Sequence, residues 1–150
     1  MAENHQQAQT AFLVTLSSGS APHGRPMATA QVDDGLETIY FATERNSPKV
    51  SEIKTNNRVF LGYTAGNDWA SITGLAHIIN DREKIQELWT DAWKNWFSGP
   101  DDPNLTLIAV SPEIGEYWDA PGRAVVVAKL AYTAVTGKKT ELGSHAKVAL

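Results

Sequence analysis

Apolar and polar residues alternate along much of the chain up to residue 79, and this period of two is typical of β-strands buried on one face. Five strands are predicted on this basis, at residues 10–17, 25–32, 36–43, 59–64 and 69–79. Turn-forming residues at 18–24, 33–35 and 65–67 separate them. Pro26 cannot donate a ladder hydrogen bond, so the second strand is expected at a sheet edge or at a bulge.

A short helix is predicted between the third and fourth strands, at residues 48–55. Ser47 is of a type preferred at a helix N-cap. Pro48 is favoured at the first helical position because its missing N–H would have no helical partner there. Val50 and Ile53 would face inward, and the two asparagines that follow would end the helix.

From residue 85 the apolar period changes to that of a helix. The residues that share this helical face are Ile85, Leu88, Trp89, Ala92, Trp93 and Trp96. Asn80 and Glu83 resemble a capping box at its start, although Ser or Thr is the usual first residue. Packing in the core or at a dimer interface is the favoured interpretation of the tryptophans.

Two more strands are predicted at residues 105–110 and 116–118, on either side of a Ser-Pro pair. Residues 122–136 are ambiguous, since a run of three valines favours a strand while the alanine content and the Gly-Lys-Lys stop favour a helix; the helix is preferred. Six or seven short strands with two or three peripheral helices predict a mainly β (α+β) fold. We expect a small β-barrel formed by residues 1–150 as a single domain.

Composition restricts the classes of partner. The chain has 150 residues, is 42% hydrophobic and 20% charged, and carries a net charge of −4, so a broad basic surface for nucleic acid is not expected. No apolar stretch approaches membrane-spanning length, and the polar residues 1–9 do not resemble a secretory signal. The absence of cysteine fits a reducing compartment and removes thiol chemistry. A cytoplasmic protein without nucleic-acid or membrane partners is therefore expected.

The region around the predicted short helix is locally basic. Residues 43–58 contain four basic side chains and two acidic ones, within a chain of negative net charge. The free N–H groups and partial positive charge of a helix N-terminus suit a phosphate, and Lys49 adds a full charge in the first turn. A small anionic ligand near Ser47 and Lys49 is one interpretation. An ordinary capped surface helix with a solvated lysine is the other.

The second predicted strand offers a further cation. Because side chains alternate across a strand, one face carries Arg25, Met27, Thr29 and Gln31, and the other carries Pro26, Ala28, Ala30 and Val32. The first face has hydrogen-bonding groups and is assigned to a ligand, whereas the second is small and apolar and is assigned to the barrel interior. Arg25 either forms a surface salt bridge or converges with Lys49 on one ligand.

Several motifs follow one another in a fixed order: Gly24-Arg25-Pro26-Met27, Tyr40-Phe41-Ala42-Thr43 and Ser47-Pro48-Lys49-Val50, and further on Trp96-Phe97, Gly99-Pro100-Asp101-Asp102-Pro103 and Glu116-Tyr117-Trp118-Asp119. In this order and spacing, over residues 10–150, the chain resembles the pyridoxamine-phosphate-oxidase-like FMN-binding split barrels, and within them the general stress protein 26 group. The resemblance implies a split β-barrel that binds FMN at a homodimer interface. FAD, a deazaflavin or haem are the alternative cofactors.

The resemblance also implies roles for individual residues. Arg25, Ser47 and Lys49 would hold the FMN phosphate. The residues that would flank the ribityl chain and the isoalloxazine ring are Pro26, Met27, Ala42 and Thr43. Trp118 would lie near the flavin, and Trp96 and Phe97 would reach the cofactor of the partner subunit. Pyridoxamine phosphate oxidation itself is not expected, because the basic substrate motif of those oxidases has no counterpart after Trp118.

No residue is identified as a catalytic acid or base, and the four histidines have no metal-ligand spacing, so no metal site is expected. His23, in the turn before Arg25, is the one histidine expected near the site. Neither a Ser–His–Asp ordering nor a Rossmann or P-loop motif is present. Three functions stay open: an FMN-dependent oxidoreductase of unknown substrate and electron donor, a stress protein that sequesters or senses flavin without turnover, and a ligand-free dimeric interaction module.

Overall fold

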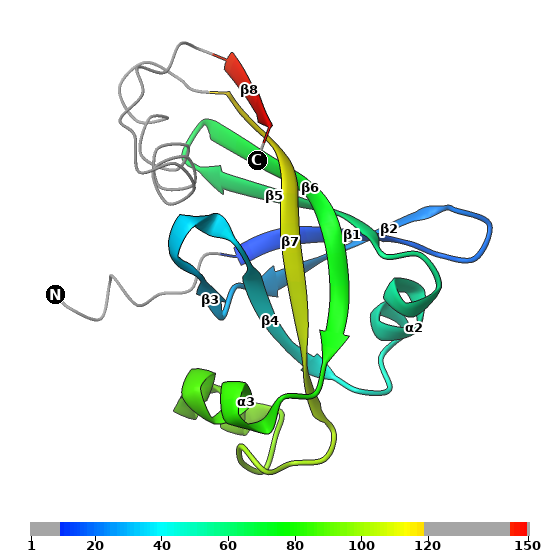
Figure 1. Cartoon of the computed structure of the whole chain (residues 1–150), viewed down its shortest axis with the longest axis vertical. Coiled ribbons are helices and arrows are strands. Elements are labelled where there is room, and N and C mark those ends of the chain that lie inside the picture. The colour runs from blue at the N-terminus through cyan, green and yellow to red at the C-terminus, as the bar shows by residue number, and fades with distance from the viewer. Residues whose placement is uncertain (1–9, 119–144, 150) are drawn as a thin grey trace, which may run out of the picture.

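The computed structural model describes residues 10–118 and 145–149. Its strands are β1 (Thr10–Leu16), β2 (Pro22–Ala28), β3 (Gln31–Val32), β4 (Ile39–Glu44), β5 (Arg58–Ala65), β6 (Asp68–Ile79), β7 (Leu105–Trp118) and β8 (His145–Ala149). They pair antiparallel in one sheet of order β2-β1-β5-β6-β7-β4-β3, and β8 pairs with the C-terminal part of β7. The sheet curls into a half-barrel with helices α2 (Pro48–Thr55) and α3 (Arg82–Leu88) against it (Figure 1). The predicted mainly β split barrel is confirmed.

The curl of the sheet follows from the path of the second predicted strand. Residues 25–32 do not form one strand: β2 pairs with β1 at one edge of the sheet, and β3 pairs with β4 at the other. Thr29 lies between the two strands, where its buried hydroxyl is 3.0 Å from the Tyr63 hydroxyl. Because only two residues separate the two edge strands along the chain, the edges must lie close together. The edge position expected from Pro26 is confirmed, since β2 pairs only with β1 among the described strands.

A single long strand, β7, replaces the two strands predicted on either side of Ser111-Pro112. Its register with β6 shifts between Thr73 and Gly74, where β7 has one residue more than β6. This bulge absorbs the proline, which a regular central strand would not accept. Gly74 is required there because a Cβ on it would lie 2.3 Å from the carbonyl oxygen of Ser111.

Two hydrophobic clusters lie on opposite faces of the first half of β7. The larger cluster fills the barrel interior and includes Ile108 and Val110, together with Ile53 from α2. The second cluster lies under α3 and includes Leu105 and Leu107. Residues 105–110 are consequently buried on both faces, which explains their continuous burial, whereas burial alternates along β1, β4 and β5.

The long tryptophan-bearing helix predicted from residue 85 is wrong in its length. Helix α3 ends at Leu88, Trp89 leaves the helical conformation, and a 3₁₀ turn follows at Asp91–Asn95. The break lets Trp89 and Trp93 meet edge to face, with ring centroids 5.7 Å apart, on the second cluster. Tertiary packing thus overrides the helical period.

The other expectations for residues 80–97 are confirmed in part. The rings of Trp89 and Trp93 pack in the core as interpreted, and Phe97 is buried in the second cluster, but Trp96 is 65% exposed. The predicted capping box is also wrong, because Asp81 is the N-cap and accepts from the N–H groups of Glu83 and Lys84. The helix predicted at 122–136 and the polar residues 1–9 lie outside the described residues.

Candidate functional site at the start of helix α2

Strand β4 and helix α2 are joined by a short turn that carries the predicted site. The helix has the predicted bounds, with Val50 and Ile53 buried at 2% exposure each. Ser47 occupies the N-cap position with extended backbone angles (φ −74°, ψ 152°), and Pro48 follows as the first helical residue. Local sequence signals are therefore sufficient to define this element.

The Ser47 side chain does not cap the helix. Its Oγ makes no hydrogen bond to the first-turn N–H groups, is buried, and has no hydrogen-bond partner within the described part of the chain. A buried hydroxyl without a partner is unfavourable, and native structures seldom keep one without a reason. At a helix N-terminus, this hydroxyl is a ready donor for an anion.

Lys49 follows Ser47 by two residues, and its ammonium points toward β4. Its Nζ donates to the Thr43 hydroxyl at 3.1 Å, and Thr43 itself is 4% exposed. Burial lowers the pKa of Lys49, the positive charge of Arg25 lowers it further, and Glu44 opposes the shift. The two predicted cations therefore lie close enough to repel each other.

Arg25 reaches the same region from β2. Its Nη1 donates to the carbonyl oxygen of Leu13 at 3.3 Å and to the Thr15 hydroxyl at 2.8 Å. Its Nη2 lies 3.2 Å from Oε1 of Glu52 on α2. Of the two alternatives left open for Arg25, the salt bridge is present, but only 17% and 14% of the two side chains are exposed. Its partner Glu52 lies three residues after Lys49 on α2.

Glu52 is the residue of this region that sequence reasoning missed. Its Oε1 also accepts from the Thr15 hydroxyl at 2.6 Å, and its Oε2 lies 3.3 Å from Nδ1 of His23. These contacts lower the pKa of the Glu52 carboxyl, chiefly the Thr15 hydrogen bond, then His23 and Arg25, against the effect of burial. Its position three residues after Lys49, which puts both side chains on the same face of α2, was the available signal. The expectation that His23 lies near the site is confirmed.

The face assignment predicted for residues 25–32 is wrong. Pro26, Ala28 and Val32 are exposed, whereas Met27 packs against the interior cluster. Arg25 lies on the same inner side as Met27, opposite Leu13 and Ala11 of β1. Alternation identifies the two faces of a strand correctly, but an edge strand leaves its small apolar face to solvent, and the long side chains cover the core.

A single chain does not bring all predicted site residues together. Ala42 alternates with Thr43 and packs against the second cluster, away from Lys49. Thr43 pairs with Thr106 near the start of β7, and Trp118 is the last residue of that strand. At about 3.3 Å per residue, Trp118 lies about 40 Å along β7 from Thr106. The structure therefore groups Arg25, Thr43, Ser47 and Lys49 and separates Trp118 from them.

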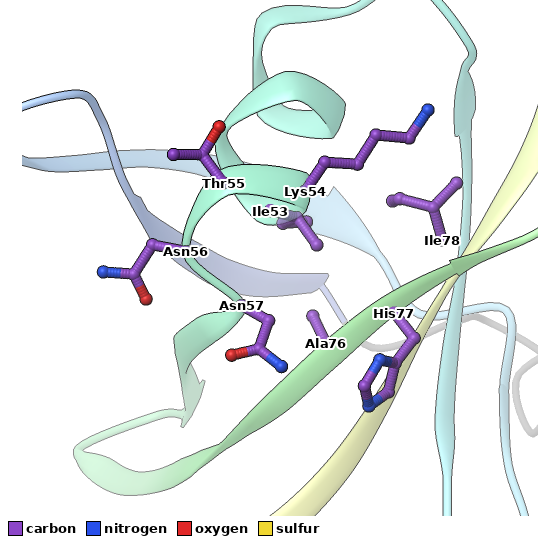
Figure 2. Close-up of a pocket in the computed structure, with 8 residues that line it drawn as sticks. All are labelled: Ile53, Lys54, Thr55, Asn56, Asn57, Ala76, His77 and Ile78. Carbon is purple, nitrogen blue, oxygen red and sulfur yellow. The ribbon is translucent and has the colours of Figure 1, made fainter.

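A pocket lies at the opposite end of α2, away from Ser47 and Lys49 (Figure 2). It has a volume of about 400 Å³ and is lined by Ile53, Lys54, Thr55, Asn56, Asn57, Ala76, His77 and Ile78. Figure 2 shows the helix end and its two asparagines on one side and Ala76, His77 and Ile78 of β6 on the other. Ile53 and Ala76 of the lining also belong to the interior cluster, and Ile78 packs against it. The lining includes none of Arg25, Thr43, Ser47 and Lys49, so this pocket is separate from that group.

Large apolar side chains remain exposed on the outer face of the sheet. They are Phe12 (50%), Phe60 (40%), Trp69 (57%), Ile114 (38%) and Trp118 (40%), and together we call them the outer apolar face. The strand register joins them: Trp69 is opposite Trp118, and Thr73 is opposite both Phe60 and Ile114. Contiguous exposed apolar surface of this kind marks interaction sites.

Residues 10–118 contain no group of three or more His, Asp or Glu side chains that could hold a metal ion. No helix in the described ranges is long and apolar enough to cross a membrane.

The family of the chain is decided by comparison with known proteins. A family model described as "Pyridoxamine 5'-phosphate oxidase like" matches residues 1–141. The chain belongs to this family. Among curated proteins, general stress protein 26 of Bacillus subtilis is 37% identical over 106 residues, which cover 67% of this chain and 73% of the relative. The family and the group expected from the sequence motifs are both confirmed.

Solved structures of the pyridoxamine 5'-phosphate oxidase-like family agree with the fold. General stress protein 26 from Bacillus anthracis aligns with a TM-score of 0.66 at 30% identity, over 75% of this chain and 85% of that chain. An FMN-binding protein related to pyridoxamine 5'-phosphate oxidase, from Nostoc punctiforme, aligns with a TM-score of 0.61 over 77% of this chain and 76% of that chain. At 14% identity, the second likeness is one of fold alone.

Proposed function

We propose that this member of the pyridoxamine 5'-phosphate oxidase-like family binds FMN and holds its phosphate at the N-terminus of α2. The observation that carries the proposal is the buried Ser47 hydroxyl, which has no hydrogen-bond partner among the described residues and lies in the same first turn of α2 as Lys49. Arg25 adds a second positive charge through its pairing with Glu52 of this helix. The Nostoc relative of the same fold is an FMN-binding protein, which supports a flavin over other phosphates. FAD would place a diphosphate in the same position.

The charges of the site fit a phosphate monoester. Such a group carries about −1.5 to −2 charges near pH 7. Lys49 and Arg25 supply two positive charges, and the helix N-terminus adds about half a charge, while Glu52 is tied to Arg25 on its other side. Burial and the charge of Arg25 lower the pKa of Lys49, and a bound phosphate would oppose both effects. It would also give the Ser47 hydroxyl an acceptor.

The rest of the flavin would lie along β2 and the end of β4. Met27 and Thr43 are proposed to flank the ribityl chain and the ring, and Pro26, whose side chain is exposed on the other face of β2, would take part through its main chain. Ala42 would take part only through the main chain, because its side chain packs against the second cluster. The flavin, when bound, supplies redox chemistry, and this chain binds and orients it.

We further propose that the site is completed in a homodimer. Trp118 lies too far along β7 to reach a ligand at Ser47 in its own chain, so its expected contact would come from the partner subunit. The outer apolar face, which includes Trp118, supplies the aromatic surface typical of the core of such an interface. The exposed Trp96 is the remaining candidate to reach the partner's cofactor.

The protein's visible spectrum and the quenching of FMN fluorescence test this proposal. We expect Lys49→Ala to weaken FMN at least tenfold, the loss of about one charge-assisted hydrogen bond, and to change riboflavin binding less than about twofold, since riboflavin lacks the phosphate. Lys54→Ala, an exposed lysine at the other end of α2, is the matched control and should bind FMN normally. A colourless protein that leaves FMN fluorescence unquenched would refute flavin binding.

An FMN-dependent oxidoreductase is the activity we propose for the bound flavin. Anaerobic mixing with NADH and NADPH tests it, because bleaching of the flavin is expected only with turnover. An oxidised flavin after both donors would support the second function, a stress protein that sequesters flavin. A cytoplasmic location is proposed alongside, on the cysteine-free composition, and localisation of a tagged protein would test it.

A further inference from the structure

Arg25 and Lys49 present an electrostatic problem before any ligand arrives. Glu52, which pairs with Arg25, lies one helical turn after Lys49 on the same face of α2, so the two cations approach the same part of the helix. Burial lowers the pKa of Lys49, and the charge of Arg25 adds to this effect. An arginine side chain is long enough to turn away from such a neighbour. It does not turn away in this structure. Three hydrogen bonds, to Leu13, Thr15 and Glu52, hold its guanidinium on the inner side of β2.

Among these three partners of Arg25, only Glu52 carries a charge. Its Oε1 accepts from both Arg25 and the Thr15 hydroxyl, and its Oε2 faces His23. Thr15 is fully buried and bonds both members of the ion pair, so it fixes their separation. The bonds of Arg25 use Nη1 twice and Nη2 once, and other N–H groups of the guanidinium remain for a ligand.

We propose that Glu52, backed by Thr15, is a positioning residue that holds Arg25 against Lys49 and so prepares the phosphate site in the ligand-free protein. The inference rests on the proposed FMN binding and adds to it a residue that touches no ligand. Preorganisation of this kind lowers the cost of ordering a long side chain when the ligand binds. The inference predicts that Glu52 strengthens phosphate binding by positioning Arg25, although the negative charge of Glu52 itself repels a phosphate.

The experiment compares FMN and riboflavin affinity by fluorescence quenching in the full-length wild type, in Glu52→Gln and in Thr15→Val. Glu52→Gln keeps the shape and removes the charge, and we expect it to weaken FMN about tenfold while riboflavin changes less than about twofold. Thr15→Val is nearly isosteric and should shift FMN in the same direction. Glu87→Gln removes the charge of another ion-paired helical glutamate, on α3, and should leave both affinities unchanged.

A double-mutant cycle separates positioning from general destabilisation. In an Arg25→Ala background, Glu52→Gln should change FMN affinity less than about twofold, because the residue that Glu52 positions is absent. A second readout needs no flavin: the side-chain Nε–H resonance of Arg25 should be sharp in the ligand-free wild type and broadened in Glu52→Gln.

The outcomes are distinguishable. Tighter FMN binding by Glu52→Gln would overturn the inference, since Glu52 would then compete with the phosphate. Unchanged FMN binding in Glu52→Gln, together with a phosphate-selective loss in Lys49→Ala, would overturn the inference and leave the proposed function intact. Absence of FMN binding by the wild type would overturn both.

Discussion

Replacing Ser47 with alanine should stabilise the ligand-free protein, although the same change at an ordinary N-cap destabilises a helix. A capping serine satisfies a first-turn N–H, and its loss costs about 0.5–2 kcal/mol. Ser47 makes no such bond, and its Oγ is buried without a partner in the described part of the chain. The change therefore removes an unfavourable group and no favourable one.

The expected magnitude follows from the cost of leaving a buried hydroxyl unsatisfied, about 1–3 kcal/mol. Part of this gain is lost because alanine leaves a small void, so we expect about 1 kcal/mol of net stabilisation. For a domain of this size, that corresponds to a rise of about 2–4 °C in Tm. FMN affinity should fall at the same time, because the phosphate loses a hydrogen-bond donor.

Thermal unfolding of the flavin-free protein, followed by an FMN titration, measures both effects. The matched control is Asp81→Ala at the N-cap of α3, where the carboxylate accepts from the N–H groups of Glu83 and Lys84. The unfolding free energy of Asp81→Ala should fall by about 1 kcal/mol, and its FMN affinity should be unchanged. If Ser47→Ala loses as much as Asp81→Ala, the Ser47 hydroxyl caps the helix in solution and the argument from its missing partner fails.

Three further outcomes are expected. Gly74→Ala should cost about 3 kcal/mol in urea unfolding, because its Cβ would meet the Ser111 carbonyl oxygen, whereas Gly99→Ala, with nothing within 4 Å of its Cβ, should cost less than about 0.5 kcal/mol. Glu52 has a pKa held below 4.5, so its carboxylate stabilises the fold above that pH and loses this effect as the pH falls through the lowered value. The difference in unfolding free energy between wild type and Glu52→Gln, measured by urea unfolding, should therefore be largest near neutral pH and shrink in acid. A difference that grows in acid would contradict this reasoning. Trp69→Arg on the outer apolar face should yield monomers in analytical ultracentrifugation, whereas Val32→Arg, at an exposed site on edge strand β3, should not; a dimeric Trp69→Arg would exclude this face as the interface.

Helix α2 shows what local sequence can determine. A Ser-Pro start and an asparagine end lie within or next to the helix itself, and the predicted bounds are those of the structure. The Arg25–Glu52 pair could not be found in that way, because its members are 27 residues apart and meet only when α2 packs against β1, the neighbour of β2 in the sheet. The reversed faces of residues 25–32 have a similar cause. A period of two separates the sides of a strand, but the position of the strand in the sheet decides which side is buried.

The continuity of strand β7 also depends on a neighbouring strand, and it affects how the site could be assembled. The sequence predicted a strand end at Ser111-Pro112, because proline is unfavourable inside a strand. The bulge that accommodates it depends on Gly74 of the neighbouring β6, which the local sequence does not reveal. Read as two strands, the segment could have folded back and placed Trp118 near Ser47. As one continuous strand, it carries Trp118 about 40 Å along β7 from the residue opposite Thr43. If Trp118 contacts the flavin, as the resemblance implies, we expect that contact to come from a second chain. Trp118 itself belongs to the apolar face that such a chain would cover.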